Sequence, residues 1–255
     1  MEVVDLLLTA DCLLKTGGMY INCHSYYSLR YGTLSVERLS ELAAAAGVKR
    51  MVLTDINNTT GVPDFVRECR SRDITPAAGI EFRDGNRLLY IGLARNNEGF
   101  RELNEFLTLH NISGEPLPPR PPSFPNAYVI YPAGGGANGN TGGTGAATPA
   151  GGRNGSAVAG MNSSRENAAR NGRAVTGSAT GNIITPPALR DNEFIGIRPS
   201  AAGRLISMKK SDIAKCVILH PVTMESTADY PVHRSLRAVD NNILLSRLTP
   251  EMTAA

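Results

Sequence analysis

The chain has 255 residues, of which 42% are hydrophobic, enough for one large domain or two small ones. Its formal net charge is +3, from 26 basic and 23 acidic residues. Four of the basic residues, all arginines, and one of the acidic residues, a glutamate, lie within residues 133–187. The rest of the chain therefore has 22 basic and 22 acidic residues. Charge therefore neither supports nor excludes a nucleic acid as a partner.

The four cysteines are scattered and form no Cys-x-x-Cys pair; they are Cys12, Cys23, Cys69 and Cys216. This spacing argues against a structural zinc site and against a secreted disulfide scaffold. No apolar run approaches the roughly 18 residues that a membrane span needs, and residues 1–8 lack the basic start of a signal peptide. We therefore expect reduced thiols, a cytoplasmic location and no membrane partner.

From residue 19 onward, segments with the spacing of strands alternate with segments that have helical spacing. The predicted strands, in chain order, are 20–24, 50–54, 75–82, 87–93, 128–131, 194–197 and 216–219. The predicted helices are 36–46, 63–72, 98–110 and 232–248. This alternation indicates an α/β domain, and we expect it to be barrel-like.

Local signals mark several of these boundaries. Ser35 is a suitable N-cap for the first helix, and Gly47 is a natural residue to end it. Asp84-Gly85-Asn86 predicts a tight hairpin between the third and fourth strands. Asn97 is the expected cap of the third helix.

Residues 133–187 are dominated by Gly, Ala, Asn, Ser and Thr and contain almost no large apolar side chain. Such a segment cannot offset the entropy of ordering its backbone, so we predict a disordered low-complexity insertion. It could act as a flexible tether or as an arginine-dotted tail that contacts nucleic acid. A tolerated surface insertion is the simpler interpretation, because loops accept added length at low cost.

Five segments resemble, in the right order, motifs of the PHP (polymerase and histidinol phosphatase) domain at the N-terminus of bacterial DNA polymerase III alpha subunits. They are His-Ser-Tyr-Tyr-Ser-Leu-Arg-Tyr-Gly at 24–32, Leu-Thr-Asp at 53–55 followed by Gly61, Gly-Ile-Glu-Phe at 79–82, the passage 89–100, and the helix from His233 to Asn242. Peptides 189–200 and 238–248 look like the Bacteroidetes branch of that family. The resemblance covers residues 19–132 and 188–250. Residues 1–18 lie outside it as an extension, and Met19 is a candidate true start.

The resemblance implies a PHP-type distorted (β/α)7 barrel. In active members of the family, His, Asp and Glu side chains at one barrel mouth hold two or three ions of zinc, manganese or iron, which activate water for phosphoester hydrolysis. In the polymerase, the polymerising carboxylates lie in a palm domain farther along the chain. This chain ends before any palm, so we expect that it does not polymerise DNA by itself.

Most of the family's metal ligands are replaced in this sequence. The His-x-His pair of the first motif is Asn22 and His24, and the family's aspartate before the motif's glycine is Tyr31. Ile56 stands where a histidine follows Thr-Asp. The late Asn-Asp-x-His motif is matched in spacing by His-Pro-Val-Thr at 220–223, which loses both ligands there.

Three ligand positions remain, and they are His24, Asp55 and Glu81. Three donors are enough for one catalytic zinc ion, so a reduced single-metal site is one hypothesis. The alternative is that these residues hydrogen-bond one another and the loops, as buried polar groups generally must. His110 and His233 are expected on helices as surface or core residues, and His220 ends a strand that could lean into the mouth.

Three functions follow. The first, which the sequence favours, is a non-catalytic domain that supports the remaining polymerase domains, docks the proofreading exonuclease subunit and meets DNA indirectly, without catalytic residues or a cofactor. The second is a metal-dependent 3′–5′ exonuclease or phosphoesterase that uses zinc or manganese at the three remaining positions. The third is a truncated or degenerate gene product.

Overall fold

The structure is a computed structural model that describes residues 19–133 and 188–253. The predicted extension at residues 1–18 lies outside these ranges, and so does the predicted insertion apart from Ala133. No helix within the described ranges is long and apolar enough to cross a membrane.

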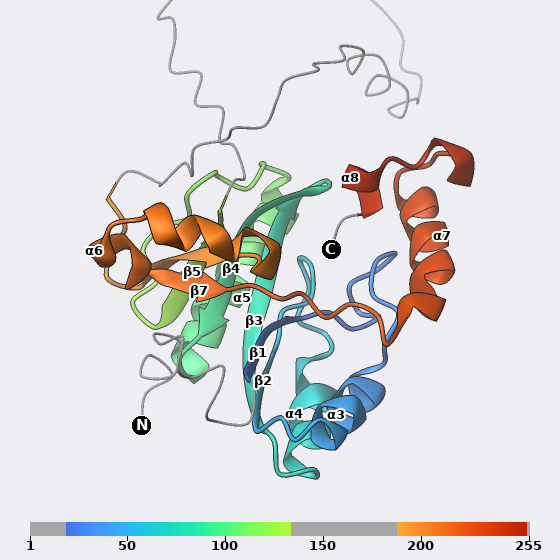
Figure 1. The fold of residues 1–255 in the computed structure, drawn as a ribbon, viewed down its shortest axis with the longest axis horizontal. Coiled ribbons are helices and arrows are strands. Elements are labelled where there is room, and N and C mark those ends of the chain that lie inside the picture. Colours follow the sequence, from blue (N-terminus) through green and yellow to red (C-terminus); the bar gives the residue numbers. More distant parts are fainter. Residues whose placement is uncertain (1–18, 134–187, 254–255) are drawn as a thin grey trace, which may run out of the picture. The chain divides into compact units, whose positions relative to one another are not determined.

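Seven strands form one curled sheet, and they are arranged in the order in which they occur along the chain (Figure 1). The strands are β1 (Met19–Cys23), β2 (Arg50–Leu53), β3 (Thr75–Asp84), β4 (Arg87–Ala94), β5 (Ala127–Pro132), β6 (Glu193–Ile197) and β7 (Cys216–Ile218). All seven predicted strands are therefore present.

The pairing is mixed. β1, β2 and β3 are parallel, β4 is antiparallel to both β3 and β5, and β5, β6 and β7 are again parallel. Just after β7, Val222 pairs with Cys23 of β1, and the amide of Val222 donates to the carbonyl of Asn22 at 2.9 Å. The two edges of the sheet thus meet at this point, which confirms the predicted α/β, barrel-like fold.

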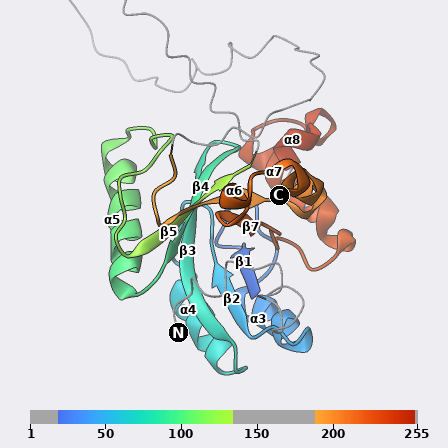
Figure 2. The ribbon, with the colours of Figure 1, turned by 60° about the vertical axis from the view of Figure 1, so that its left-hand side comes forward.

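Within the described residues, four α-helices of two turns or more pack outside the sheet. They are α3 (Val36–Ala45), α4 (Val62–Arg70), α5 (Asn97–Ser113) and α7 (Tyr230–Asp240). The other helical segments are the 3-10 helices η1 (Pro199–Ser207), η2 (Thr227–Asp229) and η3 (Leu245–Arg247) and the single-turn α-helices α6 (Lys210–Ile213) and α8 (Pro250–Thr253). Figure 2 shows α5 on the side of β3, β4 and β5, and α3 and α4 on the side of β1 and β2.

Several local signals act as predicted. The Ser35 hydroxyl accepts a hydrogen bond from the amide of Arg38 at 3.0 Å, which caps the start of α3. Gly47 has a φ of +71° just past the end of that helix, a conformation that glycine adopts without strain. Gly85, with a φ of +57°, forms the predicted hairpin between β3 and β4.

Several predicted helix boundaries differ from the structure by one to three residues, the end of the last helix differs by eight, and two of the differences have a clear local cause. α5 is capped by Asn96, one residue before the predicted cap, since the Asn96 side chain accepts from the amide of Gly99 at 2.9 Å. α7 ends at Asp240 and does not continue to Leu248. Asn242 has a φ of +50°, a left-handed conformation that asparagine tolerates better than most residues. A residue in this conformation ends a helix.

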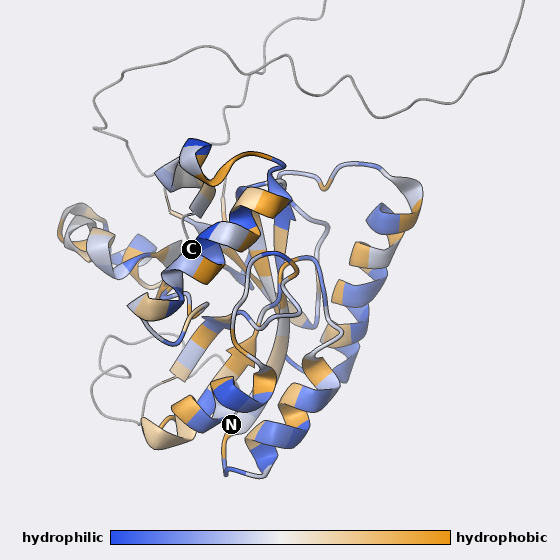
Figure 3. Ribbon diagram, turned by 90° about the vertical axis from the view of Figure 1, so that its right-hand side faces the viewer, coloured by the Kyte–Doolittle hydropathy of each residue, from blue (hydrophilic) through white to orange (hydrophobic). Residues whose placement is uncertain are grey.

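The core has three parts, and Figure 3 shows hydrophobic residues recurring along the helices that cover the sheet. The barrel interior contains Ile21, Val52, Ile91, Leu93, Tyr128, Ile130, Phe194, Val217 and Leu219. A second cluster packs α3 and α4 against the outer face of β1 and β2, and a third packs α5 against β3, β4 and β5. Successive residues of a strand thus pack alternately in the barrel interior and against the outer helices, because side chains of a strand alternate between its faces.

Candidate functional site

The three candidate ligands lie at one end of the barrel. His24 and Asp55 follow the carboxyl ends of the parallel strands β1 and β2, and Glu81 lies within β3. All three are buried, with exposed fractions of 0%, 1% and 0%. The carboxyl ends of parallel strands meet at one edge of a sheet, which is why residues so far apart in sequence converge here.

His24 is held between two side chains. Its Nε2 lies 2.9 Å from Oε2 of Glu81, and its Nδ1 lies 3.1 Å from the hydroxyl of Thr223. A carboxylate only accepts hydrogen bonds, so Nε2 carries a proton and donates it to Glu81. A protonated Nε2 has no lone pair to offer a metal ion.

Arg83 occupies the other side of Glu81. Its Nε donates to Oε1 of Glu81, and its Nη2 donates to the Tyr31 hydroxyl at 3.1 Å. Its guanidinium lies 4.6 Å from the centre of the Tyr31 ring, and that of Arg237 lies 5.1 Å from the same centre. Tyr31, which the resemblance places at a ligand position of the family, thus lies next to two cations.

The charge balance of this cluster favours an ionised Glu81. Burial alone would raise the pKa of its carboxyl group, but the neighbouring His24 and Arg83 outweigh burial and lower the pKa to about 2. Arg83 is itself 8% exposed, so the ion pair is largely removed from water. The guanidinium therefore supplies the positive charge that Glu81 needs as a buried carboxylate.

Asp55 is used in a different way. Its Oδ1 accepts from the amide of Ser25 and the hydroxyl of Ser28, both at 2.7 Å, and its Oδ2 accepts from the Ser25 hydroxyl at 2.8 Å. These bonds anchor the loop that leaves β1. The structure therefore brings His24 and Glu81 into contact, whereas Asp55 bonds to this loop.

This donor set does not fit a metal ion as it stands. The atoms that would bind metal on His24, Asp55 and Glu81 are engaged in hydrogen bonds, and the Arg83 cation already neutralises Glu81. Asn22, at the first replaced position, accepts a hydrogen bond from Thr54 at 2.8 Å. Within residues 19–133 and 188–253, no three His, Cys, Asp or Glu side chains are grouped in a way that could hold a metal.

A cavity of about 270 Å³ opens beside the network. It is lined by Tyr27, Leu29, Tyr31, Ile56, Asn57, Asn58, Arg83, Gly85, Arg237 and Asp240. Arg237 donates to Asp240 at 2.7 Å and to the Met252 carbonyl at 2.9 Å, so this second cation is also paired. The barrel mouth therefore has a cavity, but the two arginines that line it are already paired with Glu81 and Asp240.

The other histidines lie away from the candidate ligands. His220 is exposed and lines a separate hollow beside α3, so it does not lean into the mouth. His110 bonds the Phe106 carbonyl within α5. His233 is fully buried, and its Nδ1 lies 2.8 Å from the Tyr31 carbonyl. Of the two positions expected for it, surface or core, the structure shows the core.

Sequence reasoning missed the residues that surround Glu81. Arg83 had a usable signal, because residues two apart on a strand point to the same face. Arg237 had none, since it lies about 200 residues beyond Tyr31 and only the fold places it beside that ring. Thr223, which bonds His24, is at a position that the resemblance to the late motif had already singled out as a replaced ligand.

Comparisons with known proteins agree with this architecture. Residues 21–128 match the family model described as PHP domain. The DNA polymerase III alpha subunit of Ureaplasma parvum is 35% identical over 83 residues, which are 32% of this chain and 8% of that protein. The corresponding subunit of Staphylococcus aureus strain Mu50 is 32% identical over 107 residues, 38% of this chain and 10% of that protein.

A solved structure of an amidohydrolase from Chromobacterium violaceum, with bound sulfate and no metal, is 20% identical with a TM-score of 0.28. The match covers 37% of this chain and 34% of the amidohydrolase chain, and no argument is based on it. The chain spans about a tenth of the length of the curated polymerase relatives it matches. Residues 21–128 are a PHP domain, and over this part the chain is homologous to DNA polymerase III alpha subunits.

Proposed function

We propose that this chain serves as a non-catalytic PHP domain of a DNA polymerase III alpha subunit, with a structural and docking role in DNA replication. The observation that carries the proposal is the pairing of Glu81 with His24 and Arg83. A hydrolytic centre needs open ligand positions for metal and water, whereas this cluster fills them with hydrogen bonds and a cation.

A docking role is supported by apolar side chains that the described residues leave exposed near the end of the chain. Val232 and Val239 are 54% and 66% exposed and lie seven residues apart, on one face of α7. Leu244 and Leu245 follow at 68% and 45%. Apolar side chains gathered in this way are typical of protein–protein contacts, and we assign this face to the remaining polymerase domains or the exonuclease subunit.

The test is metal analysis of the purified chain together with hydrolysis of a chromogenic phosphodiester in Mn²⁺ or Zn²⁺. We expect less than stoichiometric metal and no hydrolysis above that of the Glu81→Ala variant. Glu98→Ala, an exposed glutamate on α5, is the matched control for the loss of one carboxylate.

Stoichiometric metal with hydrolysis that disappears in Glu81→Ala, but not in Glu98→Ala, would overturn the proposal. That result would support a metal-dependent exonuclease or phosphoesterase that uses His24, Asp55 and Glu81. A far-ultraviolet circular dichroism spectrum of Glu81→Ala separates loss of a ligand from loss of the fold.

A further inference from the structure

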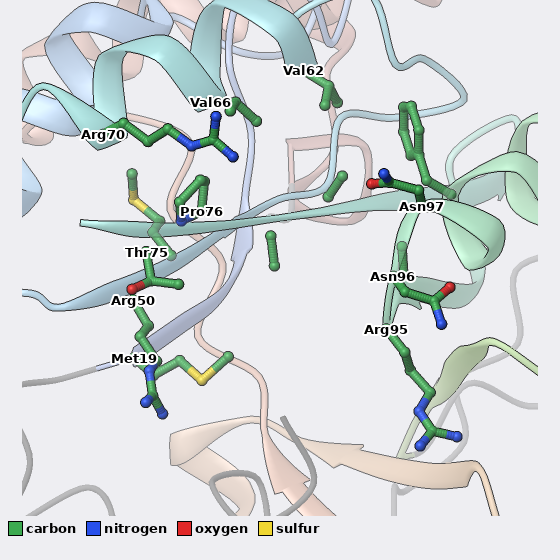
Figure 4. Close-up of a pocket in the computed structure, with 15 residues that line it drawn as sticks. Met19, Arg50, Val62, Val66, Arg70, Thr75, Pro76, Arg95, Asn96 and Asn97 are labelled. Carbon is green, nitrogen blue, oxygen red and sulfur yellow. The ribbon is translucent and has the colours of Figure 1, made fainter. Parts of the chain in front are cut away.

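A groove of about 460 Å³ lies on the outside of the barrel, between α4 and α5 (Figure 4). Its lining consists of Met19, Arg50, Met51, Val62, Val66, Arg70, Thr75, Pro76, Ala77, Ala78, Ala94, Arg95, Asn96, Asn97 and Phe100. It involves none of the residues of the barrel mouth, so it is a separate feature of the molecule.

The groove exists because of how β3 connects to β4. These two strands form a hairpin, so no helix of the described residues crosses the outer face of the sheet between α4 and α5. The first half of β3 is therefore only partly buried, at Pro76, Ala77 and Ala78. Small side chains at these positions leave the floor low and apolar.

Among the described residues that line it, the groove has three arginines and no acidic side chain. Figure 4 shows Arg50 and Arg70 on one side of the groove and Arg95 on the other. Arg50 and Arg70 form no ion pair or side-chain hydrogen bond with any described residue. Arg67, also on α4, is by contrast paired with Asp64 at 2.8 Å.

The chain itself offers a segment of matching chemistry. Met19 lines the groove, and the 18 residues before it are joined to this edge. They carry three acids and one base, which are Glu2, Asp5, Asp11 and Lys15. Their large apolar residues are Val3, Val4, Leu6, Leu7, Leu8, Leu13 and Leu14.

We propose that this groove binds the chain's own first 18 residues, with leucines on the apolar floor and acidic side chains beside the arginines. Leu14 is five residues from Met19, a stretch that spans at most about 18 Å when extended. A segment tethered this closely has an effective concentration in the millimolar range, so a few contacts are sufficient to hold it.

The groove is less suited to a phosphate or a nucleic acid. Binding a phosphate calls for several donors that converge on one point, as in bidentate arginine contacts. Here the arginines lie on opposite sides of an apolar floor (Figure 4). An apolar segment with scattered acids uses both features of the groove.

The experiment is disulfide trapping in the 255-residue chain. Cys12 lies in the segment, Cys23 and Cys69 are buried, and Cys216 is replaced by serine in every variant. Thr75→Cys places a thiol at the exposed edge of the groove, and Asp84→Cys places one at the exposed hairpin tip, far from the groove, as a control. After mild oxidation and digestion, mass spectrometry identifies which peptide is linked to Cys12.

We expect the disulfide from Cys12 to form roughly tenfold faster in Thr75→Cys than in Asp84→Cys. Because the short tether to Met19 by itself favours position 75, the charge reversals that follow separate docking from tethering. Reversing the groove charge with Arg50→Glu and Arg70→Glu should slow it about threefold to tenfold. Adding Asp5→Arg and Asp11→Arg to that variant should restore the rate.

Equal rates at the two positions would overturn the proposal, and so would a rate that does not respond to the charge reversals. Disulfides that join two chains and become more frequent with protein concentration would assign the groove to a second copy instead. None of these outcomes depends on whether the barrel mouth is catalytic, since no residue of the mouth is changed.

Discussion

The barrel mouth and the outer groove use arginine in opposite ways. At the mouth, Arg83 is 8% exposed and bonded to Glu81 and Tyr31. In the groove, Arg50 and Arg70 make no ion pair with any other described residue, and no acid lines the walls. A buried, fully paired cation contributes to the stability of the fold, whereas an unpaired cation beside an apolar floor is available for binding.

This contrast separates what the molecule keeps for stability from what it offers to a partner. Removing one member of a buried ion pair leaves the other charge uncompensated, which is strongly destabilising. An exposed charge without a partner has little effect on folding. The effect of each substitution on the free energy of unfolding therefore tests the assignment of the two regions.

The largest effect is expected for Arg83→Met. It leaves the buried Glu81 carboxylate without its cation, and we expect the free energy of unfolding to fall by about 3–5 kcal/mol. Urea denaturation followed by circular dichroism measures this directly. Arg87→Met, on the same hairpin with a side chain 56% exposed, is the control and should change stability by less than about 0.5 kcal/mol. Similar values for the two variants would mean that Arg83 does not stabilise the mouth.

An intermediate effect is expected from pH. The pKa of Glu81 is lowered to about 2 in the folded state, so its contribution to stability is present above its ordinary value of 4.5 and is lost as the pH falls toward 2. Between pH 7 and pH 3 this group should cost about 2 kcal/mol of unfolding free energy. Urea denaturation at both pH values should show a smaller loss in Glu81→Gln than in the unchanged protein.

The matched control for this measurement is Glu105→Gln, which removes a carboxylate whose side chain is 62% exposed on α5. This variant should lose as much stability between the two pH values as the unchanged protein does. If Glu81→Gln behaves in the same way, the acid sensitivity of the fold lies elsewhere. The buried Glu193 is one such place, because its pKa is also lowered. Burial alone would raise this pKa, but hydrogen bonds, first among them that from Arg120, outweigh burial.

The smallest effect is expected in the groove. Arg50→Met and Arg70→Met should each change the free energy of unfolding by less than about 0.5 kcal/mol, since neither removes an ion pair among the described residues. The measurement is again urea denaturation. A loss comparable to that of Arg83→Met would show that these arginines stabilise the fold and would remove the contrast between the two regions.

Much of the fold followed from local chemistry. The strands were predictable because their apolar runs are bounded by turn residues, and the hairpin because Asp84-Gly85-Asn86 suits a tight turn. The error at α7 arose because helical spacing continues past Asp240, while the left-handed backbone at Asn242 ends the helix. Local periodicity does not show where a backbone changes direction.

The sequence by itself determined the resemblance of residues 21–128 to PHP domains and the seven strands, and it singled out three candidate ligand positions, because each depends on residues close together in the chain. Only the tertiary structure decided what those positions do. It places Arg83 and Thr223 on Glu81 and His24, and it directs Asp55 to the serines of the first loop. The physical reason is that a charge is neutralised by whatever lies nearest in space, and curling the sheet into a barrel sets those neighbours.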